Sequence, residues 1–154
     1  MLAVQHIHPI LVHFPIVFFI TLATVDLVAA LRGRIITGRG ALGNLSLGLA
    51  LAAGAFAVAA YFMGDAALEF AESGGFHSDI AEMHEALGEA TATAFAVWAL
   101  IRIGLWWRDL RLTGAGALAV SLIEVAGAAL VVTTAYYGGQ LVFDLGVNVA
   151  HAAG

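Results

Sequence analysis

The sequence predicts an all-α integral membrane protein, folded as a bundle of four spanning helices in up-down-up-down order. Hydrophobic residues make up 62% of the 154 positions, charged residues make up 11%, and the mean hydropathy is +0.96. Soluble domains are closer to half apolar and a quarter charged. Four long apolar stretches occupy nearly the whole chain, so we expect a single membrane domain over residues 1–154.

Each spanning helix needs about 20 predominantly apolar residues. Pro9 is expected to open the first helix, because proline is tolerated in the first helical turn. The second stretch is rich in Ala and Gly, which lets neighbouring backbones or a flat ligand approach closely. The third has a polar start, and the fourth is expected to stop near Gly138 and Gly139. The expected spans are residues 9–31, 41–63, 79–107 and 115–137, with a short interfacial helix at 65–72.

Charge patterning predicts the orientation of the bundle. The chain has six basic side chains, all arginine, and they gather at one set of span ends. Connections rich in Arg or Lys stay in the cytoplasm, so both termini are expected outside, in the periplasm of a bacterial inner-membrane protein. The absence of any larger basic patch excludes nucleic acid as a partner and leaves membrane lipid as the expected surroundings. The arginines are Arg32, Arg34, Arg39, Arg102, Arg108 and Arg111.

Two ionisable residues are expected at the same depth near the arginine-bearing ends. Asp26 lies five residues before the end of the first span and Arg102 five before the end of the third. A charge at the bilayer centre costs about 2.5–3.5 kcal/mol on insertion scales, so each needs a partner. We expect a structural ion pair between them. The alternative is a proton pathway in which Glu124 of the fourth span is the next member.

The histidines are expected together at the opposite, outer ends of the spans. His13 and His84 lie at similar depth in the first and third spans, which are diagonal in such a bundle, so their rings can meet on the central axis. Two facing neutral imidazoles suit the axial positions of haem iron. The chain has no cysteine, which excludes thiolate ligands and a covalently attached haem. The pattern therefore predicts a non-covalent haem b, or structural hydrogen bonding by the same two rings.

A second group of histidines lies farther out. His6 is seven residues before His13, and His77 is seven before His84, so each pair returns to nearly one helix face. If the helices extend that far, His8 and His77 are candidates to bond haem propionates or to hold a separate metal. His151 is expected to be a solvated residue of the tail.

The motifs of the chain also carry a family resemblance. The opening His-Pro-Ile-Leu-Val-His-Phe-Pro, from His8 to Pro15, is the most specific of them, and Asp26, His84 and the GGQLVFDLGV segment at residues 138–147 accompany it. Together they resemble a bacterial family of predicted four-helix membrane proteins classified as a domain of unknown function. The resemblance implies the four-span fold, and members joined to cytochrome c or Rieske-like modules suggest electron transfer.

Three functional hypotheses follow. The first is a b-type haem subunit with His13 and His84 as axial ligands, which passes electrons between quinol and a periplasmic cytochrome. The second is a non-haem copper or zinc site built from His8, His13, His77 and His84, because imidazole suits both metals. The third is a structural or assembly subunit that packs against a larger membrane complex through its Ala/Gly-rich second helix. The first describes a redox carrier more than a self-sufficient enzyme.

Overall fold

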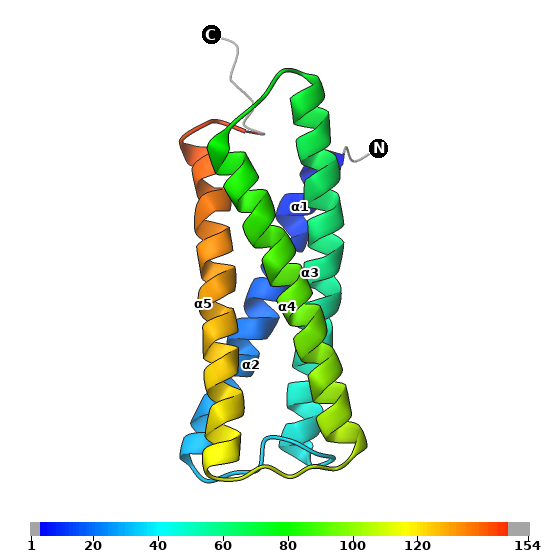
Figure 1. The fold of residues 1–154 in the computed structure, drawn as a ribbon, viewed down its shortest axis with the longest axis vertical. Coiled ribbons are helices and arrows are strands. Elements are labelled where there is room, and N and C mark those ends of the chain that lie inside the picture. The colour runs from blue at the N-terminus through cyan, green and yellow to red at the C-terminus, as the bar shows by residue number, and fades with distance from the viewer. Residues whose placement is uncertain (1–3, 148–154) are drawn as a thin grey trace.

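The computed structural model describes residues 4–147, and of residues 4–6 it describes only the backbone. The described chain forms five helices that build four spans (Figure 1). The short helix α1 and helix α2 together make the first span, and α3, α4 and α5 make the others. The helices are α1 (Val4–Leu11), α2 (His13–Leu31), α3 (Ala41–Ser73), α4 (Asp79–Trp107) and α5 (Ala115–Phe143).

The helices differ from the expected spans mainly at the end of the bundle that carries α1. Helix α3 continues to Ser73, so the expected interfacial helix at 65–72 is part of α3. The first span begins before Pro9, which lies inside α1. The break at Val12 has a covalent cause: Pro15 has no N–H to donate to the carbonyl of Leu11, and its ring crowds that carbonyl.

The spans are arranged in a ring, with α2 beside α3, α3 beside α4, α4 beside α5, and α5 beside α2. Helices α2 and α4 are therefore diagonal, as are α3 and α5, as expected of an up-down-up-down bundle. Large apolar side chains such as Leu100 (67% exposed) cover much of the outer surface. This surface suits lipid, and the four helices are long and apolar enough to cross a membrane. The chain is a multi-pass membrane protein.

The second half of the bundle repeats the first. We call α1, α2 and α3 the first hairpin and α4 with α5 the second hairpin. Helix α2 ends at Leu31 and α4 at Trp107, 76 positions later. The residue two positions after each helix end, Gly33 or Asp109, has a positive φ of 68° or 47°. The backbone hydrogen bond that follows also matches: Arg34 N donates to Ala29 O, and Leu110 N donates to Leu105 O, both at 2.9 Å.

We call the last helix of each hairpin, α3 or α5, its return helix. The two return helices correspond in the same way. Helix α3 begins at Ala41 and α5 at Ala115, each after a glycine N-cap, with an offset of 74 because the second connection is two residues shorter. The interior positions agree as well. Five buried positions of α2 correspond to buried positions of α4, namely Pro15, Phe19, Leu22, Ala23 and Asp26 with Thr91, Phe95, Trp98, Ala99 and Arg102.

This correspondence places equivalent residues of the two hairpins opposite one another on the bundle axis. At the centre, Phe19 and Phe95 stack with ring centroids 3.7 Å apart and planes 7° from parallel. Gly127 of α5 lies against Phe19, leaving no space there for a Cβ. The prolines account for the chief difference between the hairpins, because α4 has Glu85 and Thr91 at the corresponding positions and runs unbroken.

The small residues of α3 are used inside the bundle. Gly54 lies where an added Cβ would meet the carbonyl oxygen of Phe95 at 3.1 Å and the Cβ of Ala99 at 3.3 Å. The other buried positions of this face are small too, so α3 and α4 approach closely. This face therefore packs against the chain's own helices. Its buried members are Gly43, Ser46, Ala50, Ala53, Gly54, Ala57 and Ala60.

Candidate metal and cofactor site

Two histidines face each other at the end of the bundle that carries α1. We call it the histidine end, since His8, His77 and His84 lie there. The rings of His8 in α1 and His84 in α4 have centroids 6.1 Å apart and planes 82° from parallel. The two residues hold equivalent positions in the first and second hairpins, 76 positions apart, so the pair extends the axis defined by the stacked phenylalanines.

Each ring is held by the return helix of its own hairpin. His8 Nδ1 lies 2.8 Å from the carbonyl oxygen of Ala60 in α3, and His84 Nδ1 lies 3.0 Å from that of Thr134 in α5. A carbonyl oxygen can only accept, so each Nδ1 carries the hydrogen and donates it. Each Nε2 of a neutral ring therefore keeps its lone pair, which is the tautomer that metal-binding histidines adopt.

A glycine supports each ring, one helical turn after the accepting carbonyl. A Cβ built on Gly64 would lie 2.8 Å from His8 Cε1, and one built on Gly138 would lie 2.9 Å from His84 Cε1. Real Cβ atoms do not make such contacts, so a larger residue would displace the ring. The two histidines thus have matched supports: a carbonyl four residues before a glycine, on each return helix.

His13 does not join this pair. Its side chain is exposed at the start of α2, while His8 holds the position facing His84. Five residues separate His8 from His13, about 140° around a helix of 3.6 residues per turn, so the two rings point in different directions. Matching depth was the basis of the His13–His84 prediction, and depth does not determine which way a ring points.

The remaining histidines do not add to the pair in the part of the chain that the structure describes. His77 is exposed in the connection before α4. The side chain of His6 and all of His151 lie outside the described residues. Among the residues described, no three His, Asp or Glu side chains form a group that would hold a metal ion. The site therefore offers two imidazoles.

We call the opposite end of the bundle the arginine end, after Arg32, Arg34, Arg39, Arg108 and Arg111. A group of buried polar residues lies about one and a half to two and a half turns inside it. Arg102 Nη1 is 3.0 Å from Asp26 Oδ2 and 3.3 Å from Glu124 Oε1. The three side chains are at most 2% exposed. Arg102 thus pairs with Asp26, as expected, and with Glu124 as well.

Two further side chains, which the sequence analysis did not single out, complete this group. Ser46 Oγ lies 2.5 Å from Asp26 Oδ1, and Trp98 Nε1 donates to Glu124 Oε1 at 3.1 Å. Arg102 also donates to the carbonyl oxygen of Ile36, at 2.8 Å. Ile36 is fully buried in the connection after α2, so this connection closes the bundle end. We call Asp26, Ser46, Trp98, Arg102 and Glu124 the buried polar cluster.

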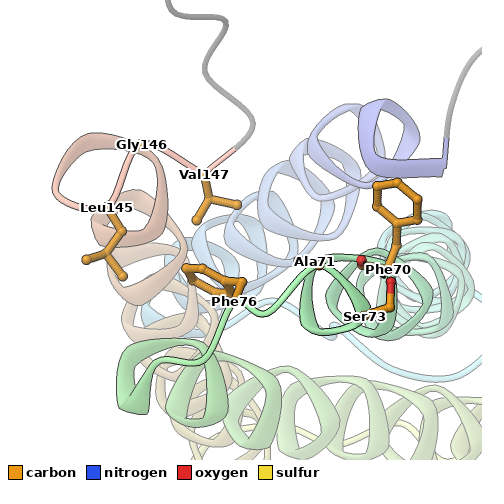
Figure 2. A pocket seen from close by; sticks show the side chains of 8 residues that line it. Phe70, Ala71, Ser73, Phe76, Leu145, Gly146 and Val147 are labelled. Carbon is orange, nitrogen blue, oxygen red and sulfur yellow. Dashed lines mark hydrogen bonds between the residues drawn. The ribbon is translucent and has the colours of Figure 1, made fainter.

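A shallow pocket of about 450 Å³ opens at the histidine end. Figure 2 shows Phe76 between the end of α3, with Phe70 and Ser73, and the segment after α5, with Leu145 and Val147. Its lining is mainly apolar and carries no histidine, carboxylate or arginine. The pocket is therefore a surface hollow beside the connection and supplies no metal ligand.

Comparisons with known proteins give a family. The family described as "Predicted membrane protein (DUF2231)" matches residues 5–151, nearly the whole chain. No curated protein and no solved structure matches the sequence.

Proposed function

The chain belongs to the DUF2231 family of predicted membrane proteins, and we propose that this member is a b-type haem-binding electron-transfer subunit of the bacterial inner membrane. The facing pair of His8 and His84, each with its Nδ1 on a backbone carbonyl, is the observation that supports the proposal. In it, His8 takes the place that the sequence analysis gave to His13, and His84 keeps its role.

The donor set suits haem better than a metal held by protein alone. Structural zinc takes about four protein ligands, and catalytic zinc takes three. Haem iron has its four equatorial nitrogens from the macrocycle and needs at most two axial ligands, which histidine commonly provides. Two imidazoles with free Nε2 atoms meet that requirement. When bound, haem would supply one-electron chemistry.

The chain's own residues define what these ligands can do. The carbonyls of Ala60 and Thr134 fix the tautomer and the direction of each ring. Thr134 is itself fixed, since its hydroxyl lies 2.8 Å from that of Thr91 on α4. Helices α3 and α5 therefore position the ligands, and α1 and α4 carry them.

Charge at the histidine end indicates the kind of partner. Seven carboxylates lie in the last turns of α3 and the first turns of α4, whereas the arginines lie at the other end. An acidic surface attracts cationic partners and raises their rate of association. With the arginine end in the cytoplasm, this surface faces the periplasm and suits a basic periplasmic cytochrome, with quinol as the partner within the bilayer. The carboxylates are Asp65, Glu69, Glu72, Asp79, Glu82, Glu85 and Glu89.

Copper is the second candidate, favoured by the spacing of the two rings. Imidazole suits copper, and metal–imidazole bonds are about 2 Å long. The ring centroids are 6.1 Å apart, a separation that two imidazoles bound to one ion can have. The proposal for copper keeps the same two ligands.

The test is an optical spectrum and a metal analysis of protein purified from cells supplied with haem. We expect a Soret band that responds to reduction in wild type and in His13→Ala, and its loss in His8→Ala and in His84→Ala. One copper per chain without a Soret band would show that the site binds copper and not haem. Protein that binds neither would overturn it.

A further inference from the structure

We propose that Asp26 and Glu124 share one bound proton, so that the buried polar cluster is a proton-binding site within the membrane. The ligand is a single proton held between two carboxyl groups beside Arg102. This inference does not depend on the haem proposal, because the cluster lies at the other end of the bundle.

The charges of the cluster require a proton. Asp26 and Glu124 are 0% exposed, and Arg102 is the cation in both of their ion pairs. With both carboxyl groups ionised the cluster has a net charge of −1, and an uncompensated charge is costly in an apolar interior. One bound proton makes the cluster neutral. The other groups that face it are uncharged: Ser46 from α3, Trp98 from α4 and the Ile36 carbonyl.

The hydrogen bonds indicate where that proton lies. Among the described residues, no donor reaches Glu124 Oε2, although the atom is buried. Asp26 Oδ2 is also without a hydrogen bond, since its contact with Arg102 is an ion pair only. Both groups contact the same nitrogen of Arg102, Asp26 Oδ2 at 3.0 Å and Glu124 Oε1 at 3.3 Å, so the two carboxyl groups lie next to each other. Two ionised carboxyl groups can only accept, so a proton on one of them is needed to join the pair.

Ser46 gives a second, separate indication. Its Oγ lies 2.5 Å from Asp26 Oδ1 and 2.8 Å from the carbonyl oxygen of Leu42, both of which are acceptors in the ionised cluster. A hydroxyl has one hydrogen, and a serine inside a helix often directs it to the carbonyl four residues earlier, here Leu42. If Ser46 donates to Leu42, the hydrogen of the short contact must come from Asp26; if Ser46 donates to Asp26, the Leu42 contact has no hydrogen. Protonated Asp26 satisfies both contacts.

The repeat shows that Glu124 is an addition to an otherwise balanced arrangement. Asp26 and Arg102 hold equivalent positions in the two hairpins and cancel in charge. Glu124 of α5 corresponds to Ala50 of α3, which is buried and apolar. An ion pair that only joins the hairpins needs no second carboxylate. Glu124 is therefore the residue that gives the cluster its capacity for a proton.

Infrared spectroscopy tests this proposal, because a protonated carboxyl group has a carbonyl stretch separate from that of a carboxylate. We would compare wild type with Glu124→Gln, Asp26→Asn and the double variant, all in detergent micelles at neutral pH. We expect a protonated-carboxyl band in wild type that the double variant lacks and that Asp144→Asn, at an exposed acid outside the spans, retains. An identical band in wild type and the double variant, or no band in wild type, would overturn the proposal.

Folding of the variants is checked by circular dichroism and gel filtration. If the double variant does not fold, Glu124→Gln is used as the test in its place, because its amide oxygen can still accept the hydrogen bond from Trp98. We then expect the wild-type band to shift or vanish in this variant. An unchanged band in folded Glu124→Gln would show that the proton is not shared with Glu124.

Discussion

Phe19 and Phe95 hold the same position in successive hairpins and stack on the bundle axis with centroids 3.7 Å apart. Both rings are at most 2% exposed. Because α2 and α4 are diagonal, this contact joins helices that are not neighbours in the ring. It lies between the histidine pair and the buried polar cluster, and it separates the two sites.

Truncating one of these rings tests how much the stack stabilises the bundle. Phe95→Ala should lower the free energy of unfolding by about 3–5 kcal/mol, because it leaves a cavity at the centre. Val97→Ala, two residues away and 50% exposed, should change it by less than about 0.5 kcal/mol. Denaturant titration in micelles measures both. Equal effects of the two changes would show that the stack adds no stability.

The glycines behind the histidine rings offer a test without changing a ligand. Gly138→Ala should displace His84, because the new Cβ would lie 2.9 Å from Cε1. We expect metal or haem affinity to fall about 10–100-fold, as when a hydrogen-bond partner of a ligand is lost. Gly139→Ala is the control, since an added Cβ there has open space. Titration of the purified protein with haem or copper distinguishes them, and equal affinities would contradict this role of Gly138.

Removing the buried cation should be costly. Arg102→Ala leaves Asp26 and Glu124 without their ion-pair partner, and breaking a buried pair in this way costs about 3–5 kcal/mol. Acidic buffer should restore part of this loss, because protonated carboxyl groups need no cation. The exposed Arg108 is the matched control, with an expected change below about 0.5 kcal/mol. We would measure the free energy of unfolding of Arg102→Ala and wild type at neutral and at acidic pH. An equal loss of stability at both pH values would refute this prediction.

Asp109 provides a pH-dependent prediction outside the spans. Its Oδ1 accepts from the backbone N–H of Arg39 at 2.8 Å, and its carboxylate also accepts from Arg111. The backbone N–H of Arg39, and after it Arg111, hold the pKa of Asp109 below its usual range. The ionised form is thus favoured in the folded state, and its stabilisation is lost as the pH falls through the lowered pKa.

We therefore expect Asp109→Asn to melt at a lower temperature than wild type at pH 7. The difference should shrink as the pH falls below about 3.9, the ordinary value for aspartate. Asparagine tolerates the positive φ at this position, so the change tests charge. Thermal melts at a series of pH values measure it. A difference that is constant with pH would exclude ionisation as the cause.

The spans were predictable because apolar length and helix-ending residues determine them. The predicted boundaries at residues 31, 41, 79, 107 and 115 coincide with helix ends in the structure. The end of α3 was not predictable in the same way. Its last turns, from Asp65 to Ser73, are too polar to count as a span, yet they continue the helix because no glycine or proline interrupts them before Gly74.

The pairing of His84 with His8 was harder to predict from the sequence. Depth along a helix follows from counting residues, but the direction of a ring depends on which face of α1 or α2 packs inward, and the break at Val12 changes that relation. The repeat was hidden for a related reason. Few positions of the hairpins are identical, among them His8 and His84, and the offset changes from 76 to 74 across the connections.

The connection at residues 74–78 joins two halves that pack as equivalent partners. If packing between the hairpins, rather than this covalent link, holds the halves together, the link is dispensable. Fragments 1–75 and 76–154, expressed from separate genes in one cell, should then find each other in the bilayer and copurify as a heterodimer. A four-span protein would in that case behave as a noncovalent pair of two-span polypeptides.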